Sequence, residues 1–286
     1  MKRNINIERI SKIIRQYNLK PKKSFGQNFL VNMNLVDRII SSMGELANHD
    51  ILEIGPGAGV LTRELLSRGA RKVIAIEKDA QFLDPLKDIG RAHPNKLVLI
   101  NQDFFEVNTK LLLKKPVKIV SNLPYNIGTQ ILLQFITSKS WPPFWDSLTL
   151  MFQQEVAARI TSTPYNKSYG RLSIISQWRS EIKTLFNVDA ESFIPVPKVK
   201  STVLQFTPIL KPLFVAHQGT LEHIVKVAFS QRRKMLRQCL KSVHEEIEKV
   251  LISLEIDPKS RAEEISVEQF CKLANILNSS KCDKKS

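Results

Sequence analysis

Four consecutive residues near the middle of the chain combine an amide, backbone carbonyls and an aromatic ring. They are Asn122, Leu123, Pro124 and Tyr125. The apolar run over 117–121 predicts a buried strand before them, and the apolar spacing over 128–135 predicts a helix after them. The four residues therefore follow the carboxyl end of a strand, where open α/β sheets bind their ligands. Their groups could hold a planar base by its exocyclic amine.

A glycine turn between a predicted strand at 51–54 and a predicted helix at 60–67 is a second candidate. Its glycines are Gly55, Gly57 and Gly59. Glycine lets the backbone approach a ligand at a helix N-terminus. The dinucleotide pattern G-x-G-x-x-G would need glycine where Val60 stands. The alternating glycines favour a nucleoside without phosphates over a pyrophosphate, and a purely structural turn is the alternative.

Acidic residues follow the next two predicted strands. Glu77 comes after the strand at 72–76 and could accept both hydroxyl groups of a ribose, while repelling a 2′-phosphate. Asp103 comes shortly after the strand at 97–100 and could accept an adenine amino group. Phe104 beside it offers an apolar wall. Each of these acids alone is weak evidence for a binding site, but their placement after successive strands indicates one nucleoside site.

The elements that must position these residues alternate between strands and helices, which predicts an α/β fold with a mostly parallel sheet covered on both faces. A helix is expected over 34–43, beginning at Asn32 or Asn34, and the loop 24–30 before it is too short and polar for a strand. Further elements are expected as a helix over 79–89, a strand over 147–152, a helix over 153–160, and later strands over 172–178 and 202–206. From residue 220 the pattern is helical, at 221–229, 234–243, 246–254 and 267–277.

This pattern predicts four regions. They are a basic, exposed N-terminal arm over 1–23, a ligand-binding α/β domain over 24–210, a small all-α domain over 211–278 and a disordered tail over 279–286.

Composition narrows the class of partner. The 286 residues carry a net charge of +16 and a pI near 9.8, which favours nucleic acid as a partner. The stretch 226–241 holds several cations and no acid, and we expect a helical face that contacts phosphates, although a solvated helix is the alternative. The RNA-binding candidates there are Arg232, Arg233, Lys234 and Arg237.

Three widely spaced cysteines and five scattered histidines show no metal-ligand spacing, so we expect no metal. No apolar run approaches the roughly 20 residues of a membrane span, and no signal peptide is apparent, so we expect a cytoplasmic protein.

Several ordered motifs carry a family resemblance from about Lys23 to Leu277. Besides the glycine turn, the two acids and residues 122–125, they are 25–30 (FGQNFL), 169–173 (YGRLS), 193–199 (FIPVPKV) and 229–234 (FSQRRK). The chain resembles the small-subunit ribosomal RNA adenine N6,N6-dimethyltransferases, which are Rossmann-like class I methyltransferases. Val196 and Gly128 depart from the family's usual proline and serine.

The resemblance implies a seven-stranded sheet, S-adenosylmethionine as cofactor, and a monomer acting on 16S rRNA in an assembling small subunit. Two adjacent adenosines in the 3′-terminal hairpin loop would each be methylated twice. The resemblance also implies that the cofactor pocket is lined by Asn28, Leu30, Gly55, Glu77, Asp103 and Asn122. The glycine turn and the apolar wall described above add Gly57 and Phe104 to this set.

The resemblance assigns the catalytic role to residues 122–125. Hydrogen bonds from adenine N6–H to the Asn122 amide oxygen and the Leu123 carbonyl would free the nitrogen lone pair, with Pro124 stiffening the turn. Tyr125 would stack on the base, with Phe193 on its other face or, alternatively, in the core. Two rivals remain: a large-subunit (23S) rRNA adenine methyltransferase of the antibiotic-resistance type, and a non-catalytic RNA-binding assembly factor.

Overall fold

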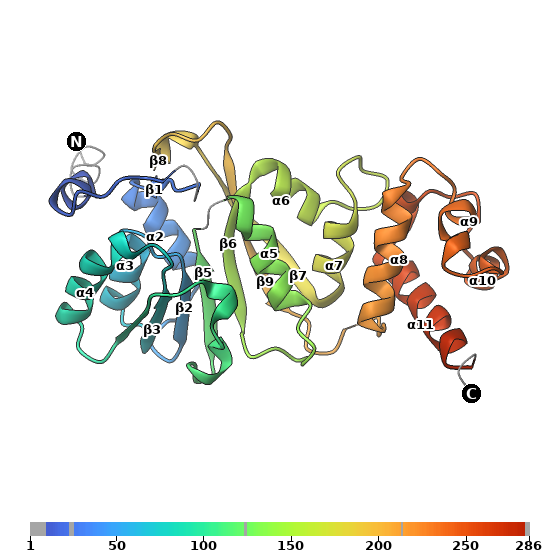
Figure 1. The fold of residues 1–286 in the computed structure, drawn as a ribbon, viewed down its shortest axis with the longest axis horizontal. Helices are drawn as coiled ribbons and strands as arrows, with labels where there is room; N and C mark the ends of the chain where they lie inside the picture. The colour runs from blue at the N-terminus through green and yellow to red at the C-terminus, as the bar shows by residue number, and fades with distance from the viewer. Residues whose placement is uncertain (1–9, 23–25, 123–124, 213, 284–286) are drawn as a thin grey trace. The chain divides into compact units, whose positions relative to one another are not determined.

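The computed structural model describes residues 10–22, 26–122, 125–212 and 214–283 (Figure 1). Its sheet has seven strands in the order β4-β3-β2-β5-β6-β9-β7. The strands are β2 (Asp50–Ile54), β3 (Lys72–Ile76), β4 (Leu97–Ile100), β5 (Val117–Ser121), β6 (Ser147–Gln153), β7 (Ser180–Val188) and β9 (Ser201–Pro208). Strands β2 to β6 pair in parallel, and β9 runs antiparallel to β6. The mostly parallel α/β sheet expected from the sequence is confirmed.

The register of the parallel strands brings their carboxyl ends level. Ile54 pairs with Ile76, and Ile76 pairs with Ile100. On the other side of β2, Glu53 pairs with Val120. The residues that follow these four strands therefore lie along one edge of the sheet, where ligands of open α/β sheets bind.

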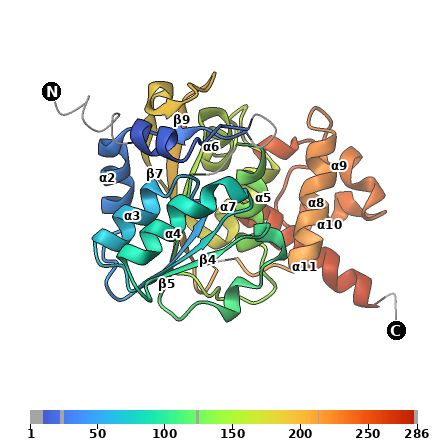
Figure 2. The same ribbon diagram turned by 60° about the vertical axis from the view of Figure 1, so that its left-hand side comes forward.

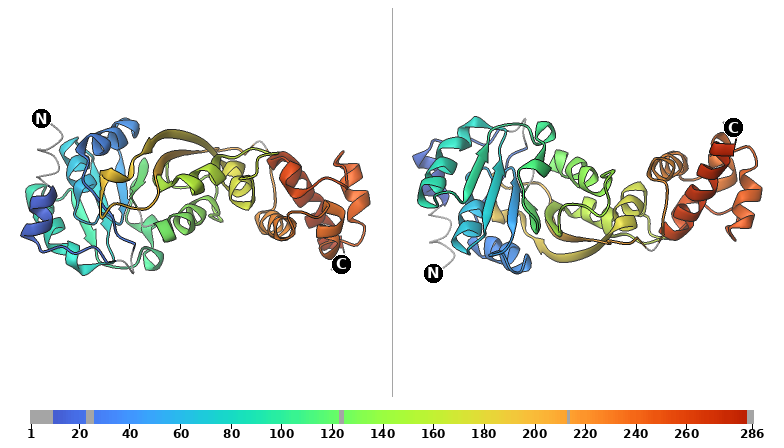
Figure 3. Two further views of the ribbon diagram at one scale, coloured as in Figure 1. Left: turned by 90° about the horizontal axis from the view of Figure 1, so that it is seen from above. Right: turned by 90° about the horizontal axis from the view of Figure 1, so that it is seen from below.

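Helices cover both faces of this sheet, as the two views in Figure 3 show. The α-helices between Met33 and Thr161 are α2 (Met33–Ser42), α3 (Val60–Ser67), α4 (Leu83–Ala92), α5 (Tyr125–Ile136) and α6 (Gln154–Thr161). The buried faces of α2, α3 and α4 form one hydrophobic cluster with strand residues such as Ile51 and Val73. Asn32 caps α2 by accepting the N–H groups of Asn34 and Leu35, so the first of the two expected caps is used.

The strand expected over 172–178 is wrong. These residues form helix α7 (Arg171–Arg179), and the extra strand is β7 directly after it. The Ser173 hydroxyl accepts the Gly170 N–H at 3.0 Å, which starts the helix. Ile174 and Trp178 then lie one turn apart and are both buried. A short apolar run does not distinguish a strand from a buried helix by periodicity, which explains the error.

The exposed arm expected over 1–23 differs from what the described residues 10–22 show, and residues 1–9 and 23 lie outside the described residues. Residues 10–16 are helical, and Ile10 and Leu19 are buried, while Lys20 to Lys22 are exposed as expected. The loop before α2 also contains a short strand, β1 (Phe29–Leu30), which pairs antiparallel with β8 (Phe193–Ile194). The expectation that residues 24–30 lack a strand is therefore wrong for residues 29–30.

After the last strand, the described residues form the α-helices α8 (Gln218–Ser230), α9 (Leu236–Cys239), α10 (Ile247–Ser253) and α11 (Val267–Asp283) (Figure 2). The expected helix over 234–243 is reduced to α9 and a 3-10 turn over Leu240–Ser242. The Leu236 N–H donates to the Ser260 carbonyl at 2.8 Å, and this pairing draws the preceding backbone out of a helix. At the far end, α11 continues to Asp283, through residues for which the sequence predicts disorder.

The chain divides into two compact units. One comprises Met1–Leu132, Pro143–Ala157 and Lys183–Pro208, and the other comprises Leu133–Pro142, Ala158–Ile182 and Ile209–Ser286. The last crossing, between Pro208 and Ile209, lies close to the boundary expected at 210. Two earlier stretches also group with the C-terminal helices, so the division into functional domains stays a prediction.

Candidate active site

A cavity of about 270 Å³ opens at the carboxyl edge of the sheet, within the first unit. Its volume is close to the lower end of ordinary small-molecule pockets, about 300 Å³. The predicted site residues among its lining are Asn28, Leu30, Gly55, Gly57, Glu77, Asp103, Phe104, Asn122 and Phe193. The structure therefore brings all eight residues expected around the cofactor to one place.

The glycine turn needs its glycines for conformation. Gly55, Gly57 and Gly59 have φ angles of 68°, 54° and 76°, all in the left-handed region. A Cβ on Gly59 would overlap the side chain of Ile89, whereas a Cβ on Gly57 would meet nothing within 4 Å. Gly59 is thus required for packing, and Gly57 leaves open space on the pocket side of the turn.

Glu77 is locked to this turn. One carboxylate oxygen accepts the Gly57 N–H at 3.0 Å, and the other accepts the Asp79 N–H at 2.8 Å. Burial raises the pKa of Glu77, and these backbone donors oppose the rise without cancelling it. Each carboxylate oxygen can accept a second hydrogen bond. The carboxylate is thus held in place with acceptor capacity to spare.

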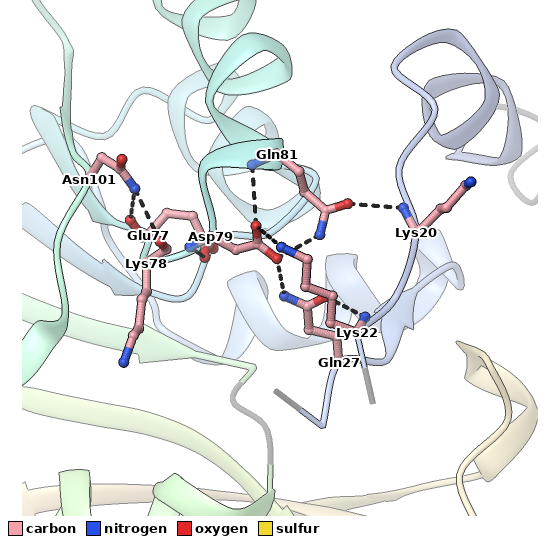
Figure 4. Close-up of polar contacts among 8 residues, drawn as sticks. All are labelled: Lys20, Lys22, Gln27, Glu77, Lys78, Asp79, Gln81 and Asn101. Atoms are coloured by element: carbon pink, nitrogen blue, oxygen red, sulfur yellow. Dashed lines mark hydrogen bonds and ion pairs between the residues drawn. The ribbon is translucent and has the colours of Figure 1, made fainter. Parts of the chain in front are cut away.

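Asp103 lies near the neighbouring strand end. Its carboxylate accepts the Lys78 ammonium at 2.8 Å and the Phe105 N–H at 3.1 Å. The Lys78 hydrogen bond lowers the pKa of Asp103 and keeps the carboxylate ionised. The Asn101 amide donates to the carbonyl of Glu77 at 2.8 Å and joins the ends of β3 and β4 (Figure 4).

The N-terminal segment, which contains Lys20, Lys22 and Gln27, contacts this edge of the sheet through Asp79. The Asp79 side chain is only 3% exposed. Figure 4 shows Lys22, Gln27 and Gln81 converging on its carboxylate, with distances of 2.9, 3.0 and 2.6 Å. Burial by itself raises the pKa of Asp79, but these hydrogen bonds outweigh it and the net shift is downward. Gln81 also accepts the Lys20 N–H at 3.0 Å.

Sequence reasoning missed Glu53 as a site residue. It lines the pocket, is fully buried, and accepts the Thr62 hydroxyl at 2.6 Å on one oxygen. Burial raises its pKa to about 7, and its other oxygen has no partner among the described residues. An acid between the apolar residues Leu52 and Ile54 of this strand was the available signal.

Of the four residues 122–125, Asn122 is the one whose side chain the structure describes. Asn122 follows β5 and lines the pocket. The hydroxyl of Ser121 before it donates to the carbonyl of Ile54 and ties β5 to β2. Leu123 and Pro124 lie outside the described residues, as does the Tyr125 side chain, although α5 begins at Tyr125.

The Phe193 side chain is 2% exposed and belongs to the hydrophobic cluster while also lining the pocket. The antiparallel pairing of Leu30 with Phe193 delivers both residues to the cavity. The predicted stacking role of Phe193 stays a prediction.

The basic candidates lie in the second unit and on a turn, not on one helical face. Arg232, Arg233 and Lys234 follow the end of α8, and only Arg237 lies in a helix. The expectation of one helical phosphate-contacting face over 226–241 is therefore wrong. Arg232 pairs with Glu263 at 2.5 Å, and Arg237 lies 3.4 Å from Glu248, whereas Arg233 and Lys234 are exposed.

The pocket fits a nucleoside better than a phosphate. Glu77 and Asp103 offer acceptors for hydroxyl and amino groups, Gly57 leaves space, and Phe104 is a buried apolar neighbour. Lys78 is the one Lys or Arg among the described lining residues, and its ammonium is bound to Asp103. Residues 10–22, 26–122, 125–212 and 214–283 contain no group of three His, Cys, Asp or Glu suited to a metal.

A seven-stranded sheet in which antiparallel β9 lies between β6 and β7, with this pocket at its carboxyl edge, defines a Rossmann-like methyltransferase that uses S-adenosylmethionine. The acceptors and open glycine turn are the chemistry that this cofactor's nucleoside requires.

The chain belongs to the ribosomal RNA adenine dimethylase family, whose model matches residues 18–279. A protein of Paracoccus denitrificans named ribosomal RNA small subunit methyltransferase A is 48% identical over 268 residues, 94% of this chain and 95% of the relative. A protein of the same name from Ruegeria is 47% identical over 272 residues, 95% of this chain and 97% of the relative.

Solved structures agree on the fold. A dimethyladenosine transferase of Plasmodium falciparum has a TM-score of 0.74 at 24% identity, covering 87% of this chain and 97% of that one. The 23S rRNA methyltransferase ErmE has a TM-score of 0.67 at 25% identity, covering 88% of this chain and 100% of that one. Within the described ranges, no helix combines the length and apolar character that crossing a bilayer demands.

Proposed function

We propose that this protein transfers methyl groups from S-adenosylmethionine to N6 of two adjacent adenosines in the 3′-terminal hairpin loop of small-subunit rRNA, giving dimethyladenosines. The observation that carries the proposal is the convergence of Gly57, Glu77, Asp103 and Asn122 on one cavity. The names of the relatives at 47–48% identity support the small subunit as the source of the RNA.

The cofactor roles follow from the donors and acceptors of the pocket. We assign Glu77 to the ribose hydroxyls, because its carboxylate is held by two backbone N–H groups and retains free acceptor sites. We assign Asp103 to the adenine amino group and Phe104 to an apolar wall of the pocket. Gly55 and Gly57 form the turn beside the nucleoside, and Asn28 and Leu30 close the pocket from the N-terminal segment.

Catalysis then depends on the nucleophile. S-adenosylmethionine supplies a methyl group already activated by its sulfonium. Asn122 accepts an N6–H of the target adenine, which favours a pyramidal nitrogen with an available lone pair. An amide also avoids the cost of placing a third carboxylate charge beside those of Glu77 and Asp103. Leu123, Pro124 and Tyr125 keep the carbonyl, turn and stacking roles expected from the sequence.

The remaining parts of the proposal rest on the resemblance and the net charge. The protein acts as a cytoplasmic monomer on a small subunit that is still being assembled, and its C-terminal helices bind rRNA phosphates. Light scattering of the purified protein tests the monomer, because a dimer would have twice the mass of 32.7 kDa.

The deciding experiment incubates purified protein and labelled cofactor with small and large subunits from cells that lack these methyl groups. We expect label in the small subunit alone, mapped by primer extension to two adjacent adenosines. Label in 23S rRNA would instead support the antibiotic-resistance type of enzyme. RNA binding without any transfer would leave a non-catalytic assembly factor.

A further inference from the structure

Tyr165 is a large aromatic residue held out in solvent on a strained backbone. It lies in the loop that joins α6 to α7 (Figure 1), with φ of 67° and 80% of its surface exposed. A positive φ is uncommon for residues other than glycine and costs free energy when the side chain is bulky. A turn of this kind is formed more easily by glycine or asparagine, so the turn itself does not require tyrosine.

The backbone on both sides of the ring is fixed. The Tyr165 N–H donates to the carbonyl of Glu263 at 2.9 Å. The carbonyl of Asn166 accepts the N–H of Tyr169 at 2.9 Å and an Arg232 guanidinium N–H at 3.4 Å. Tyr169 is fully buried, and its hydroxyl donates to the carbonyl of Ile265 at 2.9 Å. The loop is therefore anchored while the ring of Tyr165 stays in water.

Exposed cations lie close to Tyr165 in the sequence, and others lie on a turn of the second unit that contacts the same loop. Lys167 and Arg171 follow Tyr165 and are exposed. The turn after α8 is tied to the same loop by Arg232, and its next residues, Arg233 and Lys234, are also exposed. The acidic residue Glu263 contacts the loop through its backbone carbonyl. Its carboxylate is paired with Arg232 at 2.5 Å. An exposed ring among cations matches the chemistry of single-stranded RNA, whose bases stack and whose phosphates are negative.

We propose that Tyr165 stacks on an unpaired base of the rRNA substrate, while Lys167, Arg171, Arg233 and Lys234 hold the adjoining phosphates. This inference rests on the proposed function. It adds a second contact with an RNA base, made by the second unit, to the contact that Asn122 makes with the target adenine. The strain at Tyr165 is retained because the ring is needed for RNA and not for folding.

That relationship allows a sharp test, because Tyr165→Gly removes the ring and relieves the backbone together. We expect its thermal midpoint to equal or exceed that of wild type. Its affinity for a labelled single-stranded oligoadenylate should fall about 5- to 150-fold, the range of aromatic–base stacking. Its affinity for duplex RNA of the same length should be unchanged. Tyr165→Phe should behave as wild type, as should Ile252→Ala, which trims another exposed apolar side chain in the same unit.

Equal affinity of Tyr165→Gly and wild type for the oligoadenylate would overturn the stacking role, and equal losses for both RNAs would as well. A loss seen only with intact small subunits would place a ribosomal protein on this surface and also overturn it. Methyl transfer by wild type is measured alongside. If wild type transfers methyl groups and Tyr165→Gly binds normally, the inference fails alone; if wild type neither binds RNA nor transfers, the proposed function fails.

Discussion

The ammonium group of Lys22 lies 2.9 Å from the carboxylate of Asp79, two residues beyond Glu77. The Asp79 side chain is 3% exposed and also accepts from Gln27. This pair joins the segment that carries Asn28 and Leu30 to the strand end that carries Glu77. The N-terminal segment and the proposed ribose site should therefore move as one body.

Breaking that pair should weaken cofactor binding. In Lys22→Met, Asp79 keeps its amide donors but loses its cation, and we expect roughly threefold to tenfold lower affinity for S-adenosylhomocysteine by calorimetry. Amide hydrogen exchange over residues 26–30 should accelerate. Lys87→Met is the matched control, because it removes an exposed pair with Asp84 on α4. Equal affinities for the two variants would separate the segment from the cofactor site.

The free energy of unfolding should fall as the pH rises from about 4.5 to about 7, because Glu53 loses its proton over this window. Its folded-state pKa is about 7 and its ordinary value is near 4.5, so the folded protein binds more protons between these values. The stabilisation is complete below about pH 4.5 and is lost as pH rises through about 7, in total about 3 kcal/mol. Glu53→Gln should be flatter across this window and more stable than wild type at pH 8 in urea titrations. Glu106→Gln, at an exposed position, should keep the wild-type slope.

Two glycines of one turn should respond differently to the same change. Gly59→Ala puts a methyl group into the side chain of Ile89 and 3.0 Å from Leu86, so we expect a loss of about 2–4 kcal/mol in unfolding free energy. Gly57→Ala meets no atom within 4 Å and should lose only about 1 kcal/mol, from its positive φ. The affinity of Gly57→Ala for the cofactor should fall further than that of Gly59→Ala, since the methyl group at position 57 enters the pocket. Normal binding by Gly57→Ala would contradict the placement of the nucleoside beside the turn.

Asn122→Ala should separate binding from chemistry. The variant lacks the proposed acceptor for N6–H, so we expect turnover to fall by about 100-fold or more. Affinity for rRNA should be retained, which filter binding checks on the same preparation. Turnover close to wild type would remove Asn122 from the mechanism.

The basic turn after α8 should act through its exposed members. Arg233→Glu should lower rRNA affinity and flatten its dependence on salt by about one unit of slope per lost phosphate contact. Arg232 is a poorer test because its pairing with Glu263 also supports the fold. Lys96→Glu makes the same charge reversal at an exposed position in the first unit. A slope shared by wild type and Arg233→Glu would leave this turn without an RNA role.

Much of the site could be predicted because it depends on strand ends. In a parallel sheet the residue after each strand reaches a common edge, so Glu77 and Asn122 could be brought together from apolar runs alone. The same reasoning could not find Glu53, whose position depends on burial against Thr62. Nor could it find the contact of Gln27 with Asp79, since a side-chain pair 52 residues apart leaves no local pattern.

The sequence by itself determined the parallel strands β2 to β6, the glycine turn and the acids, because each follows from local hydrophobic periodicity and backbone conformation. Tertiary structure decided what those patterns leave open. Residues 171–179 became a helix because Ile174 and Trp178 could be buried on one side, and the basic turn formed because Leu236 pairs with Ser260. The pairing of Leu30 with Phe193 brought the N-terminal segment to the pocket. Contacts between distant residues decided all three, and they outweigh local preference when it is weak.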